Sequence, residues 1–362
     1  MAGELVTISR MAIDIEADSL YHYFEKVCLI QISSAKATFI IDPLAVQDLG
    51  ALAPLMENPA VEKVFHAASY DIFCLRRDYR FSFANIFDTH IAAQLLGYEQ
   101  LGLDALLEKL LGIVHSKRRQ RDDWSRRPLA PEQLAYAAMD THHLLALRDV
   151  LEKQLRDVDR LTWAQEEFQH LAAHEIQEKE FDREGFRRIK GSRDMPLQQL
   201  AVLKALYLLR DQYARALNVP PFKVMNNTVL LELAVHPPRS PNEMFQRPGI
   251  SFRVARRFAA EICRTIERAG AEDPSSLALA ARNSAKPPTR EAKARLESLK
   301  EWRRARSEEL HLPVGVVFPG TMLEILAAAP PADMVALEAI GGMRRWRARQ
   351  FGQEILDILH PR

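Results

Sequence analysis

The sequence contains few cysteines and no long apolar run. Its 362 residues include three cysteines, Cys28, Cys74 and Cys263, which are widely spaced and form no CxxC pair. This distribution excludes a disulfide framework and a cysteine-based zinc site, so buried thiols are expected. No apolar run approaches the roughly 20 residues of a membrane-spanning helix, and no basic segment followed by an apolar core opens the chain. We therefore expect a cytoplasmic protein with no membrane partner.

A strong charge of either sign is also absent, because the net charge is +1. The charge is nevertheless unevenly distributed along the chain. Residues 1–160 carry 18 Lys+Arg and 23 Asp+Glu, a net of −5, whereas the remainder carries 31 and 25, a net of +6. The acidic part is expected to hold a carboxylate cluster, and the basic part could help to attract a polyanion.

Apolar, β-rich runs come early in the chain and then alternate with helical patterns. Strands are predicted at about 7–15, 27–32, 38–41, 61–65 and 86–87, with a hairpin turn between the second and the third. Helices are predicted at about 46–56, 69–77, 89–96, 103–111 and 131–155, the last opened by Pro131. This order indicates a mixed sheet flanked by helices.

The second half of the chain is helical and contains an internal repeat. A charged amphipathic helix is predicted at 161–181, followed by a polar stretch at 182–195 that marks a domain boundary. Beyond it, similar residues recur every 93 positions without a gap. The matching pairs include Leu203 and Leu296, Arg210 and Arg303, Pro220 and Pro313, Leu230 and Leu323, Gly249 and Gly342, Phe258 and Phe351, and Ile262 and Ile355. We predict two small helical bundles at 196–272 and 290–362, joined by a linker at 273–289.

Two acids on the first predicted strand point to metal chemistry. Asp14 and Glu16 are two residues apart, so a strand places both on one face of the sheet. Their mutual repulsion and burial call for a positive partner, and hard oxygen ligands favour Mg²⁺ or Mn²⁺ over zinc. The alternative is a partly solvated edge strand on which the two acids have no special role.

Further candidates lie at helix starts and on a later helix. Asp71 follows a predicted strand at the start of a helix, where an acid also interacts favourably with the helix dipole. Tyr136 and Asp140 are four residues apart and therefore share one helical face. Taken singly, each of these residues is compatible with a purely structural role.

In this order and context, the residues resemble the three motifs of the DEDD exonucleases, in the DEDDy branch that carries a tyrosine. Other segments are similar to ribonuclease D at matching places: Leu29-Ile30-Gln31, Ile41-Asp42-Pro43-Leu44, Val64-Phe65-His66-Ala67, Phe87-Asp88-Thr89, Leu96-Gly97-Tyr98, Asp123-Trp124-Ser125-Arg126-Arg127-Pro128 and Phe186-Arg187-Arg188-Ile189-Lys190-Gly191. The resemblance implies a ribonuclease H-like α/β exonuclease domain at 1–165, a helical connector at 166–195, and two all-α HRDC domains formed by the repeats.

The same resemblance implies a mechanism. Asp14, Glu16, Asp71 and Asp140 would ligate two divalent cations, Mg²⁺ or Mn²⁺. Tyr136, whose ordinary pKa is near 10, would orient the attacking water rather than act as a full base. The implied activity is 3′→5′ hydrolysis of RNA that releases nucleoside 5′-monophosphates, with structured RNA such as tRNA precursors as the substrate.

Several neighbouring residues have competing interpretations. We interpret His66 as a hydrogen-bonded core residue rather than a ligand, and Asp88 as a helix N-cap. A basic loop either binds phosphates or is a solvated run of charge, and we predict salt-dependent binding of nucleic acid through it. Its residues are Lys117, Arg118, Arg119, Arg121, Arg126 and Arg127.

Two other functions remain open at this point. One is a 3′→5′ exonuclease of the Werner type that acts on DNA, because no residue identified here senses a 2′-OH. The other is a non-catalytic RNA-binding scaffold, against which the retention of all four acids and Tyr136 argues. The sequence does not determine the oligomeric state, and a monomer is the starting expectation.

Overall fold

The protein is described by a computed structural model in two compact units. The described residues are 8–46, 48–116, 118–173, 180–247, 249–250, 252–275, 277 and 289–361. One unit comprises Met1–Ala17, Val27–Ile176 and Pro287–Arg362, and the other comprises Asp18–Lys26 and Gln177–Lys286. Among the described helices, none combines the length and the apolar character that crossing a membrane requires.

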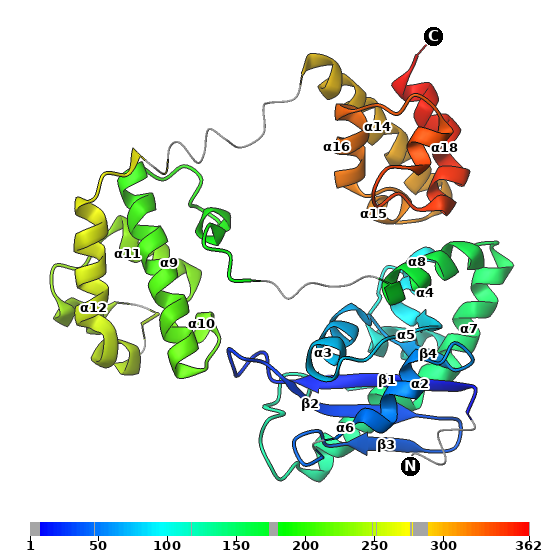
Figure 1. Ribbon diagram of the computed structural model, residues 1–362, viewed down its shortest axis with the longest axis horizontal. Helices are drawn as coiled ribbons and strands as arrows, with labels where there is room; N and C mark the ends of the chain where they lie inside the picture. Colours follow the sequence, from blue (N-terminus) through cyan, green and yellow to red (C-terminus); the bar gives the residue numbers. More distant parts are fainter. Residues whose placement is uncertain are drawn as a thin grey trace. The chain divides into compact units, whose positions relative to one another are not determined.

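A five-stranded mixed sheet forms the centre of the first unit (Figure 1). The strand order is β3-β2-β1-β4-β5, so the strand that carries Asp14 and Glu16 is the middle one. It pairs antiparallel with β2 and parallel with β4, and Asp14 lies opposite Gln31. All five strands were predicted from the sequence. Their bounds are Arg10–Ala17 (β1), Val27–Ser33 (β2), Thr38–Ile41 (β3), Glu62–Phe65 (β4) and Ile86–Asp88 (β5).

Helices cover both faces of this sheet. The side chains of Ile13 and Ile30 belong to a buried cluster with residues of α2 and α3. On the other face, α6 contacts β1, β2 and β3, while α7 contacts β1 and β4. The helices of this region are Ala53–Glu57 (α2), Ser69–Tyr79 (α3), Thr89–Leu95 (α4), Leu103–Leu111 (α5), Pro131–His142 (α6), Leu144–Asp157 (α7) and Leu161–Ala173 (α8).

Two predicted helices differ from those observed. The helix predicted at 131–155 is two helices that break at His143, whose backbone N–H donates to Thr141 instead of continuing the α-helical pattern. The break lets α6 cover β2 and β3 while α7 covers β4, which one straight helix cannot do over a twisted sheet. The helix predicted at 46–56 is shorter, with a 3₁₀ turn at Gly50–Leu52 before α2. The helix predicted at 161–181 is observed as α8 up to Ala173, residues 174–179 lie outside the described residues, and residues 180–181 are not helical.

The predicted repeat is confirmed by two bundles built alike. Helices α9 (Leu197–Leu217) and α14 (Arg290–Leu310) have the same length and start 93 residues apart. The same offset relates α10 (Pro221–Val224) to α15 (Val314–Val317), and α11 (Asn227–Val235) to α16 (Gly320–Ala328). The closing helices are α12 (Phe252–Ala271) and α18 (Arg345–Leu359), and α17 (Met334–Glu338) precedes the second of these.

Equivalent polar contacts recur in the two bundles. Arg210 donates to the carbonyl of Met225, and Arg303 donates to the carbonyl of Phe318. The long first helix of each bundle ends in a left-handed residue, Asn218 with φ 48° and His311 with φ 52°. Equivalent polar contacts and equivalent helix ends therefore accompany the same fold in both repeats.

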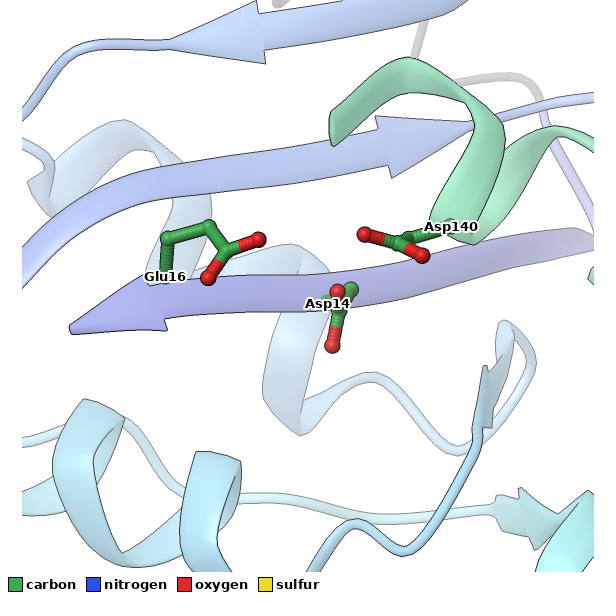
Figure 2. A group of neighbouring side chains, drawn as sticks. All are labelled: Asp14, Glu16 and Asp140. Atoms are coloured by element: carbon green, nitrogen blue, oxygen red, sulfur yellow. The ribbon is translucent and has the colours of Figure 1, made fainter. Parts of the chain in front are cut away.

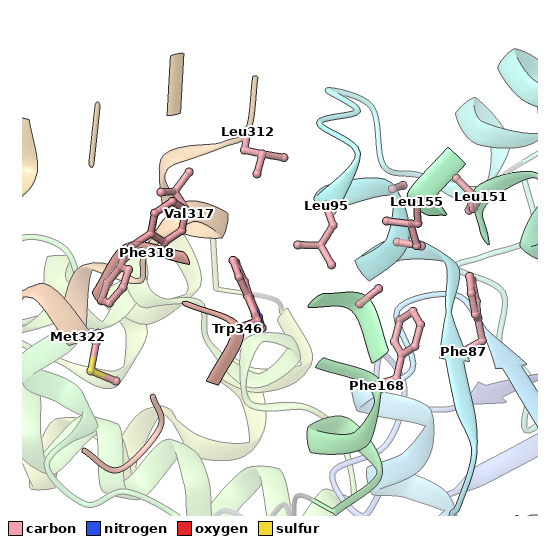
Figure 3. Packing of buried hydrophobic residues seen from close by; sticks show 14 of the residues in the cluster. Phe87, Leu95, Leu151, Leu155, Phe168, Leu312, Val317, Phe318, Met322 and Trp346 are labelled. Carbon is pink, nitrogen blue, oxygen red and sulfur yellow. The ribbon is translucent and has the colours of Figure 1, made fainter. Parts of the chain in front are cut away.

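The second bundle packs within the first unit (Figure 3). Trp346 stacks on Trp163 of α8 at 4.4 Å between ring centroids. The Glu166 carboxylate accepts from the backbone N–H groups of Arg345 and Trp346, at 2.6 and 2.9 Å. Glu166 therefore caps the N-terminus of α18, where free N–H groups and the helix dipole favour a negative charge.

The first bundle belongs to the second unit and contacts the loop Asp18–Lys26 there. Asn218 Oδ1 accepts from the backbone N–H groups of Tyr23 and Phe24, at 3.1 and 3.0 Å. The Tyr23 hydroxyl donates to Asp211 at 2.6 Å. The loop that follows β1 is thus held by side chains of the first repeat.

Candidate active site

Asp14 and Glu16 occupy one face of the central strand because β side chains alternate. Ile13 and Ile15 occupy the opposite face and are buried in the apolar core. β1 has hydrogen-bonded neighbours on both sides, because β2 pairs with Ala12–Ala17 and β4 pairs with Arg10–Ala12. The alternative of a solvated edge strand is therefore wrong for this pair of acids.

Helix α6 places a third acid, Asp140, on the same face of the sheet. Its Thr141 hydroxyl bonds Ser33 of β2 at 2.7 Å in a buried position, which fixes the helix on the sheet. Asp140 directly precedes Thr141 on this helix. Carboxylate oxygens of Asp14, Glu16 and Asp140 all lie within 4.8 Å of one another (Figure 2).

Asp71 follows a turn of the chain that the Asp88 carboxylate stabilises. It lies buried in the first turn of α3. Just before this helix, Ala67 has a φ of 62°, in the left-handed region that is unfavourable for alanine. The Asp88 carboxylate accepts from the backbone N–H groups of Ala67 and Ala68, at 3.2 and 2.8 Å, and so offsets this strain. Asp71 is not within the 4.8 Å group, but its charge acts on Asp14 and Glu16.

Burial raises the pKa of all four acids, and repulsion from neighbouring acids adds to this for Asp14, Glu16 and Asp71. Burial, followed by repulsion from Asp71, Asp140 and Glu16, raises the pKa of Asp14 well above its usual value. Burial, followed by repulsion from Asp140 and Asp71, raises the pKa of Glu16 to about 9. Burial, with the nearby charges of Asp88 and Asp140, raises the pKa of Asp71 to about 8. Such a cluster is costly without positive charge and therefore suited to cations.

The residues present fit a divalent cation on two counts. The donor set consists of carboxylate oxygens, the hard ligands that Mg²⁺ and Mn²⁺ prefer. In addition, Gln31 is fully buried opposite Asp14, and neither its amide nitrogen nor its amide oxygen has a hydrogen-bond partner among the described residues. An unpaired buried amide is costly, so this environment favours the binding of ordered water or an ion.

Tyr136 lies beside the acids and close to two other aromatic rings. It lies one turn before Asp140 on α6, and the two side chains interact electrostatically. The centroid of its ring lies 5.7 Å from that of His115 and 6.1 Å from that of the buried Trp124. Burial and the charges of Asp140, Glu16 and Asp14 raise the pKa of Tyr136 far above its usual value. The hydroxyl therefore remains protonated at neutral pH, as expected for an orienting group.

Two neighbouring residues have the structural roles that the sequence indicated. His66 Nδ1 bonds the Thr89 hydroxyl at 2.9 Å, and burial lowers the pKa of His66 to about 4. Asp88 Oδ1 caps α4 by accepting from the backbone N–H groups of His90 and Ile91. The interpretations of His66 as a hydrogen-bonded core residue and of Asp88 as an N-cap are confirmed.

The basic loop divides into anchored and exposed side chains. Arg127 donates to both carboxylate oxygens of Asp42 at 2.7 Å, and to the carbonyls of Cys28 and Trp124. It is therefore a structural anchor of the loop. Arg118 is exposed, and the Arg126 side chain is 81% exposed although it pairs with Asp123. Arg119 pairs with Asp122, Arg121 has contacts within the protein, and Lys117 lies outside the described residues.

The structure adds two residues that sequence reasoning did not assign to the site. His115 Nε2 lies 2.7 Å from Asp140 Oδ1, with the His115 side chain 5% exposed. Gln31 is the second, as its place opposite Asp14 shows. The antiparallel hairpin could have signalled Gln31, because its register pairs Gln31 with Asp14. The sequence carries no comparable signal for His115, which lies in a loop.

Comparison with family models divides the chain in the same way. Residues 2–156 match the family described as 3′-5′ exonuclease, and residues 199–266 and 292–359 each match the HRDC domain. These matches, together with the mixed sheet and the helical bundles, confirm the predicted fold class. The finer domain boundaries stay predictions.

The chain is similar to known proteins both in sequence and in structure. Ribonuclease D of Nitrobacter hamburgensis is 31% identical over 343 residues, which cover 93% of this chain and 86% of that protein. The catalytic core of RRP6 from Trypanosoma brucei is 28% identical with a TM-score of 0.68, covering 74% of this chain and 76% of that one. Escherichia coli RNase D, described as an exoribonuclease involved in structured RNA processing, has a TM-score of 0.69 at 21% identity, covering 99% and 95%. The last of these shows the shared fold.

Proposed function

Because the chain belongs to the ribonuclease D family and is a 3′→5′ exoribonuclease, we propose that it trims structured RNA, such as tRNA precursors, at the 3′ end with two divalent cations. The observation that carries the proposal is the meeting of Asp14, Glu16 and Asp140 within 4.8 Å, beside Tyr136. These residues come from chain positions more than 120 residues apart, and they meet on one face of the central strand.

The four acids are proposed to hold the cations. Asp14, Glu16 and Asp140 form the close group, and Asp71 completes the set from α3. When bound, divalent cations supply activation of water and stabilisation of the leaving 3′ oxygen. Either Mg²⁺ or Mn²⁺ suits carboxylate ligands.

The protein's own groups position the substrate and the water. In the proposed reaction, the oxygen of water bonds to phosphorus, the bond from phosphorus to the 3′ oxygen breaks, and that oxygen takes up a proton. The products are a nucleoside 5′-monophosphate and an RNA shortened by one residue. Tyr136 keeps its proton, so it can donate a hydrogen bond to a water or phosphate oxygen without acting as the base.

One assay separates this function from the two alternatives. RNA and DNA oligonucleotides labelled at the 3′ or the 5′ end are incubated with Mg²⁺, Mn²⁺ or EDTA, with Asp140→Ala as the control. Release of mononucleotides from the 3′ end of RNA, lost in EDTA and in Asp140→Ala, supports the proposal. Preference for DNA favours a Werner-type activity, and binding without hydrolysis favours a scaffold.

The exposed arginines of the basic loop are proposed to contact phosphates upstream of the scissile bond. The electrostatic influence of Asp122, a residue of this loop, on Glu16 supports this placement. Each lost phosphate contact on a single strand reduces the slope of log affinity against log salt by about 0.7. Arg118→Gln with Arg126→Gln should therefore reduce the slope by roughly 1.4, measured with the Asp140→Ala background to prevent hydrolysis. An unchanged slope would make the loop a solvated charge run.

A further inference from the structure

We propose that His115 is a positioning residue that holds Asp140 through a hydrogen bond, and this inference rests on the proposed metal-dependent function. Its Nε2 lies 2.7 Å from Asp140 Oδ1. An ionised carboxylate can only accept, so the ring N–H is the donor when Asp140 serves as a ligand. The side chains of His115 and Asp140 are 5% and 8% exposed, which keeps water from competing for this bond.

The approach of His115 follows from the end of α5. This helix ends at Gly112, which has a φ of 70°, a conformation that L side chains rarely adopt. The Gly112 N–H donates to Glu108 and the Ile113 N–H donates to Leu107, closing the helix before the chain turns away. Three residues after Gly112, His115 faces inward, whereas its neighbour Val114 is 81% exposed. The segment after α5 thus directs the His115 side chain to the acids.

A second contact orients the imidazole ring. The rings of His115 and Tyr136 lie 5.7 Å apart at an interplanar angle of 22°. Tyr136 lies one turn before Asp140 on α6 and interacts with it electrostatically, so His115 and Tyr136 both act on this carboxylate. His115 and Tyr136 approach the carboxylate from different chain segments and restrict its rotation. The remaining lone pairs of Asp140 can then face Asp14 and Glu16 (Figure 2).

This arrangement matters because three acids must present oxygens to the same small volume. A freely rotating Asp140 would lose entropy on binding a cation and would turn away from the other acids. Groups that orient metal ligands through hydrogen bonds typically change metal affinity or activity by about 10- to 100-fold. His115 is therefore expected to affect cation binding and kcat, with little effect on the binding of the RNA chain.

Two variants separate the hydrogen bond from the packing. His115→Gln retains an N–H donor and loses the ring, whereas His115→Phe retains the stacking on Tyr136 and loses the donor. His236→Gln serves as the control, because His236 is exposed and lies in the first bundle. Circular dichroism and thermal unfolding establish that each full-length variant is folded.

The measurements are Mn²⁺ affinity by calorimetry without RNA, and kcat and KM on a short oligoribonucleotide. We expect His115→Phe to weaken Mn²⁺ binding and lower kcat by about 10-fold or more, with KM changed less than about threefold, and His115→Gln to stay near wild type. Equal loss in both variants, no loss in either, or loss only in His115→Gln overturns the inference.

The failure of the underlying function gives a different result. If the wild-type protein binds Mn²⁺ but does not hydrolyse RNA, the proposed function fails, while the Mn²⁺ affinities still decide the role of His115. If the wild-type protein hydrolyses RNA and His115→Phe matches it in both measurements, only the role of His115 is overturned.

Discussion

The two faces of β1 differ in the side chains that they bury, because one face is apolar and the other is acidic. On one face, Ile13 and Ile15 join an apolar cluster that stabilises the fold. On the other, Asp14 and Glu16 are crowded against Asp140, and their raised pKa values show that this arrangement is unfavourable in the absence of a cation. Neighbouring residues of one strand therefore serve stability and function separately, and substitutions on the two faces should have separable effects.

The largest effect is expected on the acidic face. Asp14→Asn keeps the shape of the side chain but removes an anionic oxygen from the cluster. We expect kcat to fall by about a thousandfold or more, because each acid contributes to holding the cations, while the free energy of unfolding is maintained or increased. Single-turnover assays on RNA and urea unfolding measure the two quantities. Near-wild-type hydrolysis by this variant would refute the assignment of the acids.

On the apolar face, substitutions should lower the free energy of unfolding and leave kcat nearly unchanged. Ile13 is fully buried, so Ile13→Ala should lower the free energy of unfolding by about 2–5 kcal/mol, and Ile13→Val by about 0.5–1.5 kcal/mol. Below the temperature at which the variants unfold, kcat should change less than about threefold, because the packed side chain does not face the acids. Urea unfolding and RNA hydrolysis test this pair. A loss of kcat in Ile13→Val comparable to that of Asp14→Asn would show that the faces are not separable.

A smaller effect is expected for the tyrosine that lies above the acidic face. Tyr136→Phe removes the hydroxyl but keeps the ring contacts with His115 and Trp124. We expect kcat to fall roughly 10- to 100-fold, the worth of one hydrogen bond to a charged group. The matched measurement is kcat for Tyr136→Phe against Asp14→Asn at saturating Mn²⁺. An equal loss in both would point to Tyr136 as an essential base.

The smallest effect concerns stability and has a defined pH dependence. The pKa of Glu16 is about 9 in the folded protein against 4.5 as its ordinary value. Between these values the folded state binds more protons than the unfolded state, so the stability contributed by this group falls as pH rises. In EDTA, the free energy of unfolding of Glu16→Gln should therefore exceed that of wild type by about 1 kcal/mol or more at pH 8. This difference should shrink toward pH 4.

Thermal and urea unfolding at both pH values check this expectation. Addition of Mn²⁺ provides the control, because the cation stabilises the wild-type cluster more than the variant. A difference that is the same at pH 4 and pH 8 would mean that the charge of Glu16 is not the cause.

Local patterns of residues were enough to predict the fold class, the order of the strands along the chain and the repeat. Alternation in β1 placed Asp14 and Glu16 on one face, and the 93-residue offset predicted two alike bundles, because both patterns depend on local spacing. The basic loop could not be divided in the same way. Arg127 and Arg126 are neighbours in the chain, yet one is bound to Asp42 on a distant strand end and the other is exposed.

Which residues complete the site depends instead on tertiary contacts. The break at His143, the contact of His115 with Asp140 and the unpaired amide of Gln31 depend on how α6 lies across the twisted sheet. The contact of His115 with Asp140 joins a loop to a helix position 25 residues further along the chain, and its energy comes from burial and packing. Local residue patterns carry no record of such contacts, because the same short sequence is compatible with many partners until the fold selects one.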